Sequence, residues 1–305
     1  MGKKNGSAKS KAKKEARKAA QLEAQRQLDT LRAARELADP LSALPAPFVS
    51  FKRNGIEAGV EFYTAKTLPE ADKLALWGIL DTNMAPIYGQ ADWDEEAGAD
   101  KRKELAEDSA RILIIRGSAT EAAEEPASPA TSPVKAPAAV DDDKPDADKP
   151  KASTDVLGFV HFRYEIEEEC LLLYVYELQV AQRADARRKG LGKFLLMMSE
   201  MLSKKSGFAG VMFTVQRNNA DAIKFYSSCK YTTDVISPCN VDPMADDDDY
   251  SYEIYSKVWD EGAKATLAKR AEEARRMWEA EHDGRLEMQR ENGQLARNLD
   301  SAVEA

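Results

Sequence analysis

Hydrophobic residues in this chain gather in short runs whose length and spacing differ from segment to segment. Two long runs, Val156 to Ile166 and Leu171 to Val180, predict long β-strands. Partial alternation of apolar and polar residues over Ile56 to Thr64 predicts another strand. Shorter strands are expected at Ile112 to Ile115, Val211 to Val215 and Tyr250 to Trp259.

Helices are predicted between these strands and at both ends of the chain. An amphipathic pattern predicts a helix from Pro69 to Ala85, and Ala97 to Asp108 gives a second, polar one. Strong helix formers predict a longer helix from Ala16 to Leu37, which ends before Asp39-Pro40. Residues 260–300 suit a long solvated helix, with a partner-binding helix as the alternative. Further helices are expected over residues 190–205 and from Asn218 to Tyr226.

The resulting order of elements is β-α-α-β-β-β-α-β-α-β. This order predicts an α/β (α+β) fold, and it poorly suits a doubly wound nucleotide fold. Residues 117–155 differ in character, because prolines and acidic runs replace the apolar pattern. Such a segment cannot bury enough apolar surface to offset its ordering entropy, so we expect a disordered insertion in a hairpin.

Composition and charge divide the chain further. The net charge is −9, yet residues 1–18 hold eight basic residues and one acidic residue. We therefore expect a basic arm over residues 1–20, a helical segment over 21–55, a main folded domain over 56–259 and a charged helical extension over 260–305. The arm suits binding to the ribosome or to chromatin, and a merely solvated tail is the alternative.

Cysteine and hydropathy patterns restrict the compartment. Three cysteines without paired spacing, together with two histidines, do not suggest a metal site, and they suit a reducing compartment. No apolar run approaches the roughly 18 residues that a membrane-spanning helix requires. We expect a soluble protein of the cytoplasm and nucleus, with no metal and no membrane span.

The segment Arg187-Arg188-Lys189-Gly190-Leu191-Gly192-Lys193 carries the clearest chemistry. It lies between a predicted strand and a predicted helix. Backbone N–H groups at a helix start lack partners and attract anions, so glycines and cations here predict a site for a pyrophosphate. The spacing fits neither Gly-x-x-x-x-Gly-Lys-Ser/Thr nor Gly-x-Gly-x-x-Gly. A plain loop ahead of a surface helix is the alternative.

Two motifs together resemble the GNAT superfamily of N-acetyltransferases. The first is Arg-x-x-Gly-x-Gly from Arg187 to Gly192, and the second is the helix segment from Asn218 to Tyr226. The resemblance implies the GNAT fold, which is a mixed central sheet with helices on both faces, with an N-terminal helical extension and a long C-terminal helix here. The resemblance also implies acetyl-coenzyme A as co-substrate. It implies cofactor binding by Leu178, Val180, Arg187, Arg188, Lys189, Gly190, Leu191, Gly192, Lys193, Asn219 and Tyr226.

A closer resemblance is to the NatD family of N-terminal acetyltransferases, which act on histones H4 and 2A. It spans about residues 1 to 258 without the proline-rich insertion. It rests on Asp39-Pro40-Leu41, Lys52-Arg53-Asn54-Gly55, Thr82-Asn83-Met84, Tyr88 to Trp93, His161-Phe162-Arg163-Tyr164, Tyr174 to Gln179, Arg187 to Leu195 and Ser251-Tyr252-Glu253-Ile254. The insertion, the C-terminal tail and Glu165 in place of Asp depart from that family.

Amide formation requires a base, because a substrate α-amine with a pKa of about 8 is mostly protonated at neutral pH. Glu177 is the candidate, since it interrupts an apolar strand beside the glycine loop. A carboxylate at an exposed strand end is the alternative. The NatD resemblance implies that Tyr88, Tyr176 and Tyr252 surround the substrate N-terminus, with Tyr176 and Tyr252 as further catalytic groups.

Substrate recognition is expected from acidic and aromatic side chains. NatD substrates begin Ser-Gly-Arg-Gly, and the third-position arginine calls for carboxylates outside the amine pocket. The resemblance points to Glu165, and Glu167 shares its strand face two residues on. Trp93 is expected either to wall the pocket or to pack in the core.

Two other functions remain compatible with the sequence. One is a GNAT enzyme that acetylates lysine ε-amines or small amines. The other is a ribosome- or nucleic-acid-associated module with an inactive fold, although the intact Arg187, Gly190, Gly192 and Glu177 argue against it.

Overall fold

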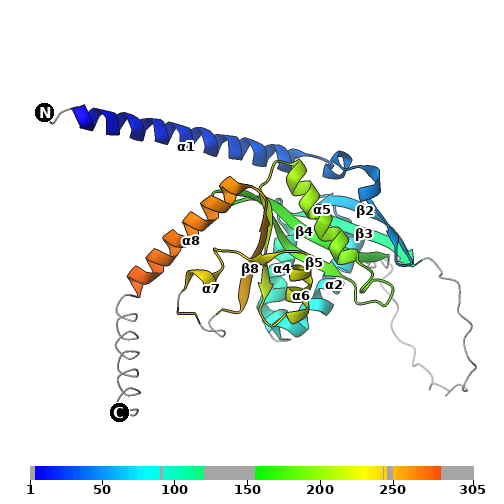
Figure 1. Cartoon of the computed structure of the whole chain (residues 1–305). Coiled ribbons are helices and arrows are strands. Elements are labelled where there is room, and N and C mark those ends of the chain that lie inside the picture. The colour runs from blue at the N-terminus through cyan, green and yellow to red at the C-terminus, as the bar shows by residue number, and fades with distance from the viewer. Residues whose placement is uncertain (1–3, 90–91, 120–154, 243, 246–249, 283–305) are drawn as a thin grey trace, which may run out of the picture. The chain divides into compact units, whose positions relative to one another are not determined.

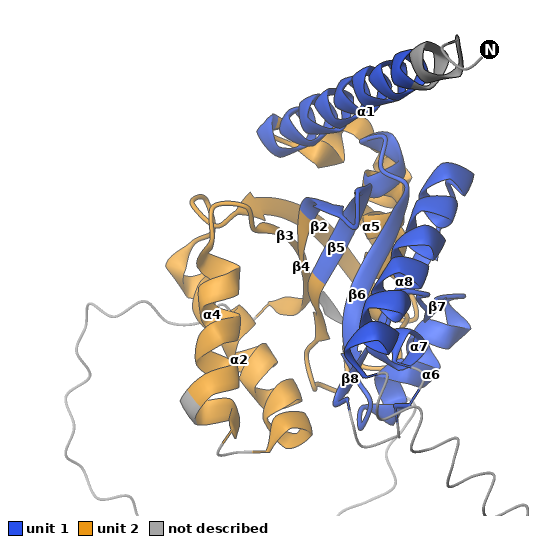
Figure 2. Ribbon diagram, turned by 90° about the vertical axis from the view of Figure 1, so that its left-hand side faces the viewer, with its two compact units in different colours: residues 1–36, 164–175, 203–305 blue, residues 37–163, 176–202 orange. Residues whose placement is uncertain are grey.

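The computed structural model describes residues 4–89, 92–119, 155–242, 244–245 and 250–282 (Figure 1). The chain divides into two compact units, coloured separately in Figure 2. Unit 1 comprises residues 1–36, 164–175 and 203–305, and unit 2 comprises residues 37–163 and 176–202. No helix among the described residues is long and apolar enough to cross a membrane.

Unit 2 contains an antiparallel sheet built from β1 (Ser50–Arg53), β2 (Ile56–Thr64), β3 (Arg111–Ala119) and the first part of β4 (Val156–Glu167). A two-residue turn, Asn54-Gly55, joins β1 to β2, with φ angles of 55° and 74°. Positive φ at both positions is typical of type I′ hairpins, in which Asn followed by Gly is the favoured pair. Two short 3₁₀ turns, Pro40–Ala43 and Ala46–Phe48, precede the hairpin.

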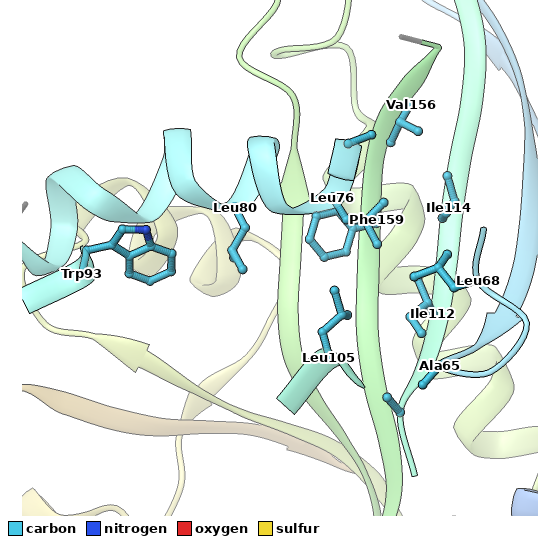
Figure 3. Close-up of a cluster of buried hydrophobic side chains, with 12 residues drawn as sticks. Ala65, Leu68, Leu76, Leu80, Trp93, Leu105, Ile112, Ile114, Val156 and Phe159 are labelled. Carbon is cyan, nitrogen blue, oxygen red and sulfur yellow. The ribbon is translucent and has the colours of Figure 1, made fainter. Parts of the chain in front are cut away.

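Helices of unit 2 cover this sheet. They are α2 (Glu70–Tyr88), the π-helical segment η3 (Trp93–Ala97) and α4 (Gly98–Ala106). Figure 3 shows their apolar side chains meeting those of β3 and β4 in one cluster, in which Leu76, Leu80 and Phe159 are at most 1% exposed. Leu113 and Ile115, on the opposite face of β3, are also fully buried, so both faces of the sheet are covered.

The strands of unit 1 show different pairing. β5 (Cys170–Val180) pairs with β6 (Gly210–Gln216) in parallel, β6 pairs with β8 (Tyr252–Val258) in antiparallel, and β7 (Thr232–Thr233) lies on β8. β5 also enters unit 2, where the amide of Ala181 donates to the carbonyl of Leu157 at 2.9 Å. The strand order is β1-β2-β3-β4-β5-β6-β8-β7, a mixed sheet as expected.

The helices of unit 1 include both terminal helices. Cys170, Leu172 and Met212 of the sheet pack with Ala263 and Leu267 of α8 in a second core cluster. The helices are α1 (Lys4–Glu36), α6 (Ala220–Ser228), α7 (Pro238–Val241) and α8 (Glu261–Glu281), and the end of α5 (Leu191–Lys205) reaches this unit.

Helix α1 changes character along its length. Residues 10–26 are all exposed, whereas Leu31 and Ala34 are buried. Gln27 donates to the carbonyl of Glu169 at 2.9 Å, and Arg35 donates to the carbonyl of Tyr164 at 2.8 and 3.0 Å. The last turns of α1 are therefore anchored on the turn between β4 and β5.

Several boundaries differ from expectation. The first helix begins at Lys4 rather than Ala16, so the basic arm is helical wherever it is described. β3 continues to Ala119, which shortens the expected insertion, and residues 120–154 lie outside the described part of the chain. The strands β1 and β7 were not predicted. The predicted C-terminal helix is described as far as Glu281, and residues 283–305 lie outside the described part.

Candidate active site

The glycine loop joins the end of β5 to the start of α5, all within unit 2. Arg188 and Gly190 have φ angles of 57° and 92°, and α5 begins at Leu191, which is 1% exposed. The amide of Phe194 donates to the carbonyl of Gly190 at 3.0 Å and so forms the first helical turn. The loop thus presents the amino end of a 15-residue helix, a place that favours an anion.

Charged side chains and a supporting hydrogen bond surround this loop. Arg187, Arg188 and Lys193 are exposed, Lys189 and Gly192 are half-buried, and all lie on the loop or in the first turn of α5. The side-chain amide of Asn54, from the β1–β2 turn, donates to the carbonyl of Lys189 at 2.7 Å. The residues predicted to hold a pyrophosphate therefore fit such a group in charge and backbone conformation.

A second brace comes from within the loop. The guanidinium of Arg183 contacts both carboxylate oxygens of Asp185, at 3.0 and 2.6 Å. A pair of parallel hydrogen bonds of this kind fixes orientation better than a single contact. Phe51 packs edge-to-face on Phe194, with ring centroids 5.3 Å apart, so β1 also supports the first turn of α5.

Glu177 is buried on β5, with 7% of the residue exposed. Lys101 Nζ of α4 lies 3.3 Å from Glu177 Oε1, and Gln179 Nε2 donates to Glu177 Oε2 at 2.8 Å. The Gln179 Oε1 atom in turn accepts from Asn83 of α2 at 2.8 Å, and Asn83 also donates to the carbonyl of Val180 at 3.1 Å. Both carboxylate oxygens of the predicted base are thus held, and this chain of contacts ends at Val180.

The two partners of this ion pair respond to burial in different ways. Burial raises the pKa of the Glu177 carboxyl, although Lys101 and the hydrogen bond from Gln179 oppose the rise. Burial alone would lower the pKa of Lys101, but the charges of Glu177 and Glu104 outweigh it and raise the pKa. Lys101 therefore stays an ammonium, while Glu177 is a stronger base than an exposed carboxylate.

Beside this pair, Tyr176 lies in an aromatic and cationic stack. The His161 ring of β4 stacks on Tyr176 with centroids 5.0 Å apart, and the guanidinium of Arg163 lies 4.1 Å from the centroid of the Tyr176 ring. Arg163 also contacts the Glu107 carboxylate at 2.6 Å, at the end of α4. Tyr176 and Glu177 are adjacent in sequence, and both are therefore linked to α4.

His161 is unusual because it is fully buried and neither ring nitrogen has a hydrogen-bond partner among the described residues. Burial, together with the charges of Arg163 and Lys101, lowers its pKa to about 3. The imidazole is therefore neutral at physiological pH, with one N–H donor and one acceptor.

Tyr88 and Trp93 form an aromatic pair at the end of α2, with ring centroids 5.5 Å apart. Trp93 is 1% exposed, belongs to the hydrophobic core and donates from its indole N–H to Asp81 at 3.1 Å. Of the two expectations for Trp93, the structure shows the core position. Tyr88 is half-buried and packs directly against it.

Four predicted site residues lie in other surroundings. Leu178 and Val180 are half-buried on β5, beyond Val175 and Phe213, where the β5–β6 register ends. Asn219 is the N-cap of α6, because its side chain accepts from the amide of Ala222 at 3.1 Å. Tyr226 of the same helix packs on Phe213 with ring centroids 4.1 Å apart.

The remaining predicted residues belong to unit 1, as Asn219 and Tyr226 do. Tyr252 begins β8 opposite Gln216 and is 36% exposed. Glu165 is already in an ion pair, since Arg35 Nη2 of α1 lies 2.7 Å from its Oε2. Burial, with the negative charges of Glu168 and Glu165 nearby, raises the pKa of Glu167. Glu165 and Glu167 therefore lie close enough for their charges to interact, and Glu165 already has Arg35 as an internal partner.

Sequence reasoning missed several residues at the site. Lys101 lies in a run of charged residues from Asp100 to Glu104. In sequence, this run has the same pattern as a solvent-exposed helix face. Asn54, Asn83, His161 and Arg163 lie inside segments that resemble the NatD family, but no role was predicted for them. The described residues hold no cluster of His, Cys, Asp or Glu arranged to bind a metal ion.

Residues 124–231 match the model of the Acetyltransferase (GNAT) family. Solved structures that the chain matches include an acetyltransferase from Streptococcus agalactiae, 11% identical, covering 68% of this chain and 99% of that chain with a TM-score of 0.41. PaiA N-acetyltransferase from Thermoplasma acidophilum, in complex with coenzyme A, is 16% identical, covering 66% and 99%, with a TM-score of 0.36. Nourseothricin acetyltransferase is 16% identical, covering 49% of this chain and 65% of its own, with a TM-score of 0.30.

The family match and the order of elements confirm the predicted GNAT fold, with its mixed sheet flanked by helices and its two terminal helices. They support an acetyltransferase that uses acetyl-coenzyme A.

Proposed function

We propose that the protein is an N-terminal acetyltransferase that transfers acetyl from acetyl-coenzyme A to the α-amine of proteins beginning Ser-Gly-Arg-Gly, such as histones H4 and 2A. The observation that carries this proposal is the buried Glu177, held at both oxygens on the strand that leads into the glycine loop. A buried, oriented carboxylate beside an anion-binding helix terminus suits a base next to a phosphorylated cofactor.

The chemistry assigns one task to each group. Acetyl-coenzyme A, when bound, supplies the thioester carbonyl, and the loop from Arg187 to Lys193 holds its phosphates. Glu177 takes a proton from the substrate ammonium, directly or through water, which leaves the neutral amine that forms the amide bond. Tyr176 is fixed by His161 and Arg163 and is a candidate to orient the amine or to return a proton to the departing thiolate. Tyr252 is the other tyrosine proposed for that step.

Specificity for an arginine at the third position is assigned to Glu165 and Glu167. Two carboxylates on one strand face suit a guanidinium, which binds carboxylates through paired hydrogen bonds. Glu165 is paired with the guanidinium of Arg35 in the structure, so a substrate arginine would share that carboxylate with Arg35 or displace it. Tyr88 is proposed to contact the substrate N-terminus, with Trp93 behind it as a rigid core support.

The test is acetylation of a Ser-Gly-Arg-Gly peptide by the full chain, with the peptide α-amine free or chemically blocked and with an internal lysine present. Transfer to the free peptide alone, and its loss in Glu177→Gln with coenzyme A binding retained, is the expected result. Transfer to the blocked peptide would identify a lysine acetyltransferase instead. Failure to acetylate any amine would favour the binding-module alternative, in which α1 contacts ribosomal RNA or chromatin in the cytoplasm or nucleus.

A further inference from the structure

Within the described part of the chain, Lys101 is the only cationic side chain that forms an ion pair with Glu177. Lys101 comes from α4, whereas Glu177 lies on β5, so this contact links a helix to the central sheet. The side chains of Lys101 and Glu177 are 21% and 8% exposed, which shields the pair from water. Lys101 Nζ also lies 3.1 Å from Glu104 Oε2, one turn along α4.

Other charged groups around Glu177 are occupied elsewhere or act in the opposite direction. Arg163 is directed to Glu107 and to the face of Tyr176. His161 is neutral, as its low pKa requires. Glu104 is negative and raises the pKa of Glu177. Gln179 and Asn83 contribute hydrogen bonds without charge.

We propose that Lys101 is a positioning residue for Glu177. The ammonium of Lys101 keeps the buried carboxylate ionised and holds Oε1, while Gln179 holds Oε2, so the carboxylate has a fixed orientation on β5. This inference rests on the proposed function of Glu177 as the base. A base must be deprotonated before the substrate arrives, and burial opposes that state. An opposite charge within hydrogen-bonding distance restores it, and the remaining basicity is set by the balance of the two effects.

The ordinary alternative is a structural ion pair that only ties α4 to the sheet. The two roles differ in what they predict for pH. If the pair is only structural and Glu177 is not the base, removing Lys101 changes stability and the pKa of Glu177, but the pH dependence of the catalytic step stays where it was. A positioning lysine changes the pH at which Glu177 becomes a base, so removing it moves the acid limb of the pH–rate profile upward.

The test compares Lys101→Met with Lys103→Met, a matched control on the same helix. Lys103 is exposed and pairs with Asp100 at 2.8 Å, away from Glu177. With the peptide substrate, Lys101→Met should lower kcat/KM on the acid limb on the order of tenfold, because an adjacent charge commonly moves a carboxyl pKa by about one unit or more. The loss should shrink as pH rises. Lys103→Met should match the wild type, and Lys101→Arg should recover much of the acid limb.

A second measurement does not depend on turnover. Titration of ¹³C-carboxyl-labelled glutamates by NMR, with Glu177→Gln used to assign the Glu177 signal, reads the pKa of the base directly. A higher midpoint in Lys101→Met than in wild type supports the inference, and equal midpoints in folded proteins overturn it. If the midpoint rises while the wild type acetylates no amine, the coupling between Lys101 and Glu177 stands and the proposed function fails.

Discussion

His161 is a fully buried side chain whose two ring nitrogens have no hydrogen-bond partner among the described residues. Most buried polar atoms in proteins are hydrogen-bonded, and an unpaired one costs free energy. Both nitrogens of this fully buried ring lack a partner among the described residues, yet the ring stacks on Tyr176 beside the predicted base. Because the unpaired imidazole costs stability at this position, its presence favours a role in the reaction or in binding a molecule.

The first prediction therefore concerns His161→Phe. The phenyl ring keeps the stacking on Tyr176 and removes the two unpaired nitrogens, so the free energy of unfolding should rise by about 1 kcal/mol at neutral pH. The folded-state pKa of about 3 lies below the ordinary value of 6.5, so wild-type stability is complete above pH 6.5 and declines as pH falls toward 3. The stability advantage of His161→Phe should widen over that range.

Chemical denaturation at several pH values, alongside kcat, measures both effects. A less stable His161→Phe at neutral pH would show that the imidazole is hydrogen-bonded in solution. Higher stability with reduced kcat would identify the nitrogens as functional.

The second prediction concerns the acidic pair. If Glu165 and Glu167 bind the third-position arginine, reversing both to Lys should raise KM for Ser-Gly-Arg-Gly peptides far more than for Ser-Gly-Ala-Gly. A charge-assisted contact contributes roughly 1.5 to 3 kcal/mol, so the preference should fall about tenfold to a hundredfold. Arg35→Met is the control, because it leaves both carboxylates in place and removes the internal partner of Glu165. Equal losses on both peptides would contradict the assignment.

Among the elements, strands with an apolar run were predictable, including the short β6, and strands without one were not. β2 has the predicted bounds, and β4 and β5 differ from the prediction by one residue at one end, because their apolar runs are long. β1 has four residues with one buried apolar side chain, Phe51, too short for a periodic signal. Glu177 could be predicted as a site residue because it interrupts an apolar strand. The role of its partner Lys101 could not, because it depends on how α4 packs against β5, which the local sequence does not encode.

The third prediction belongs to the hairpin turn between β1 and β2. Asn54→Gly retains a residue that tolerates the φ angle of 55° but removes the hydrogen bond to the Lys189 carbonyl. We expect acetyl-coenzyme A to bind several-fold more weakly, with kcat nearly unchanged at saturation, because the loop loses a brace and no catalytic group. Isothermal titration calorimetry measures the affinity. Unchanged affinity would mean that the Arg183–Asp185 pair and the first turn of α5 suffice to hold the loop.

At the scale of the whole molecule, charge is unevenly distributed. The chain is acidic overall, with a net charge of −9, while the exposed part of α1 is strongly basic. Lys11, Lys14 and Lys18 follow one another at spacings of three and four, and therefore share one face of the helix. Such a rigid basic face, carried beyond the anchored turns of α1, suits phosphate groups of RNA or DNA.

The last prediction tests that face. Replacing Lys11, Lys13, Lys14 and Lys18 with Gln, a good helix former, should weaken binding to ribosomal RNA or nucleosomal DNA while sparing acetylation of free peptides. The salt dependence of binding should become shallower by roughly one unit of slope for each lysine that contacts a phosphate. The matched control removes four exposed positive charges from α8 instead, at Lys264, Lys269, Arg275 and Arg276. If both variants lose affinity equally, only net charge matters, and α1 has no specific part in placing the enzyme near its substrates.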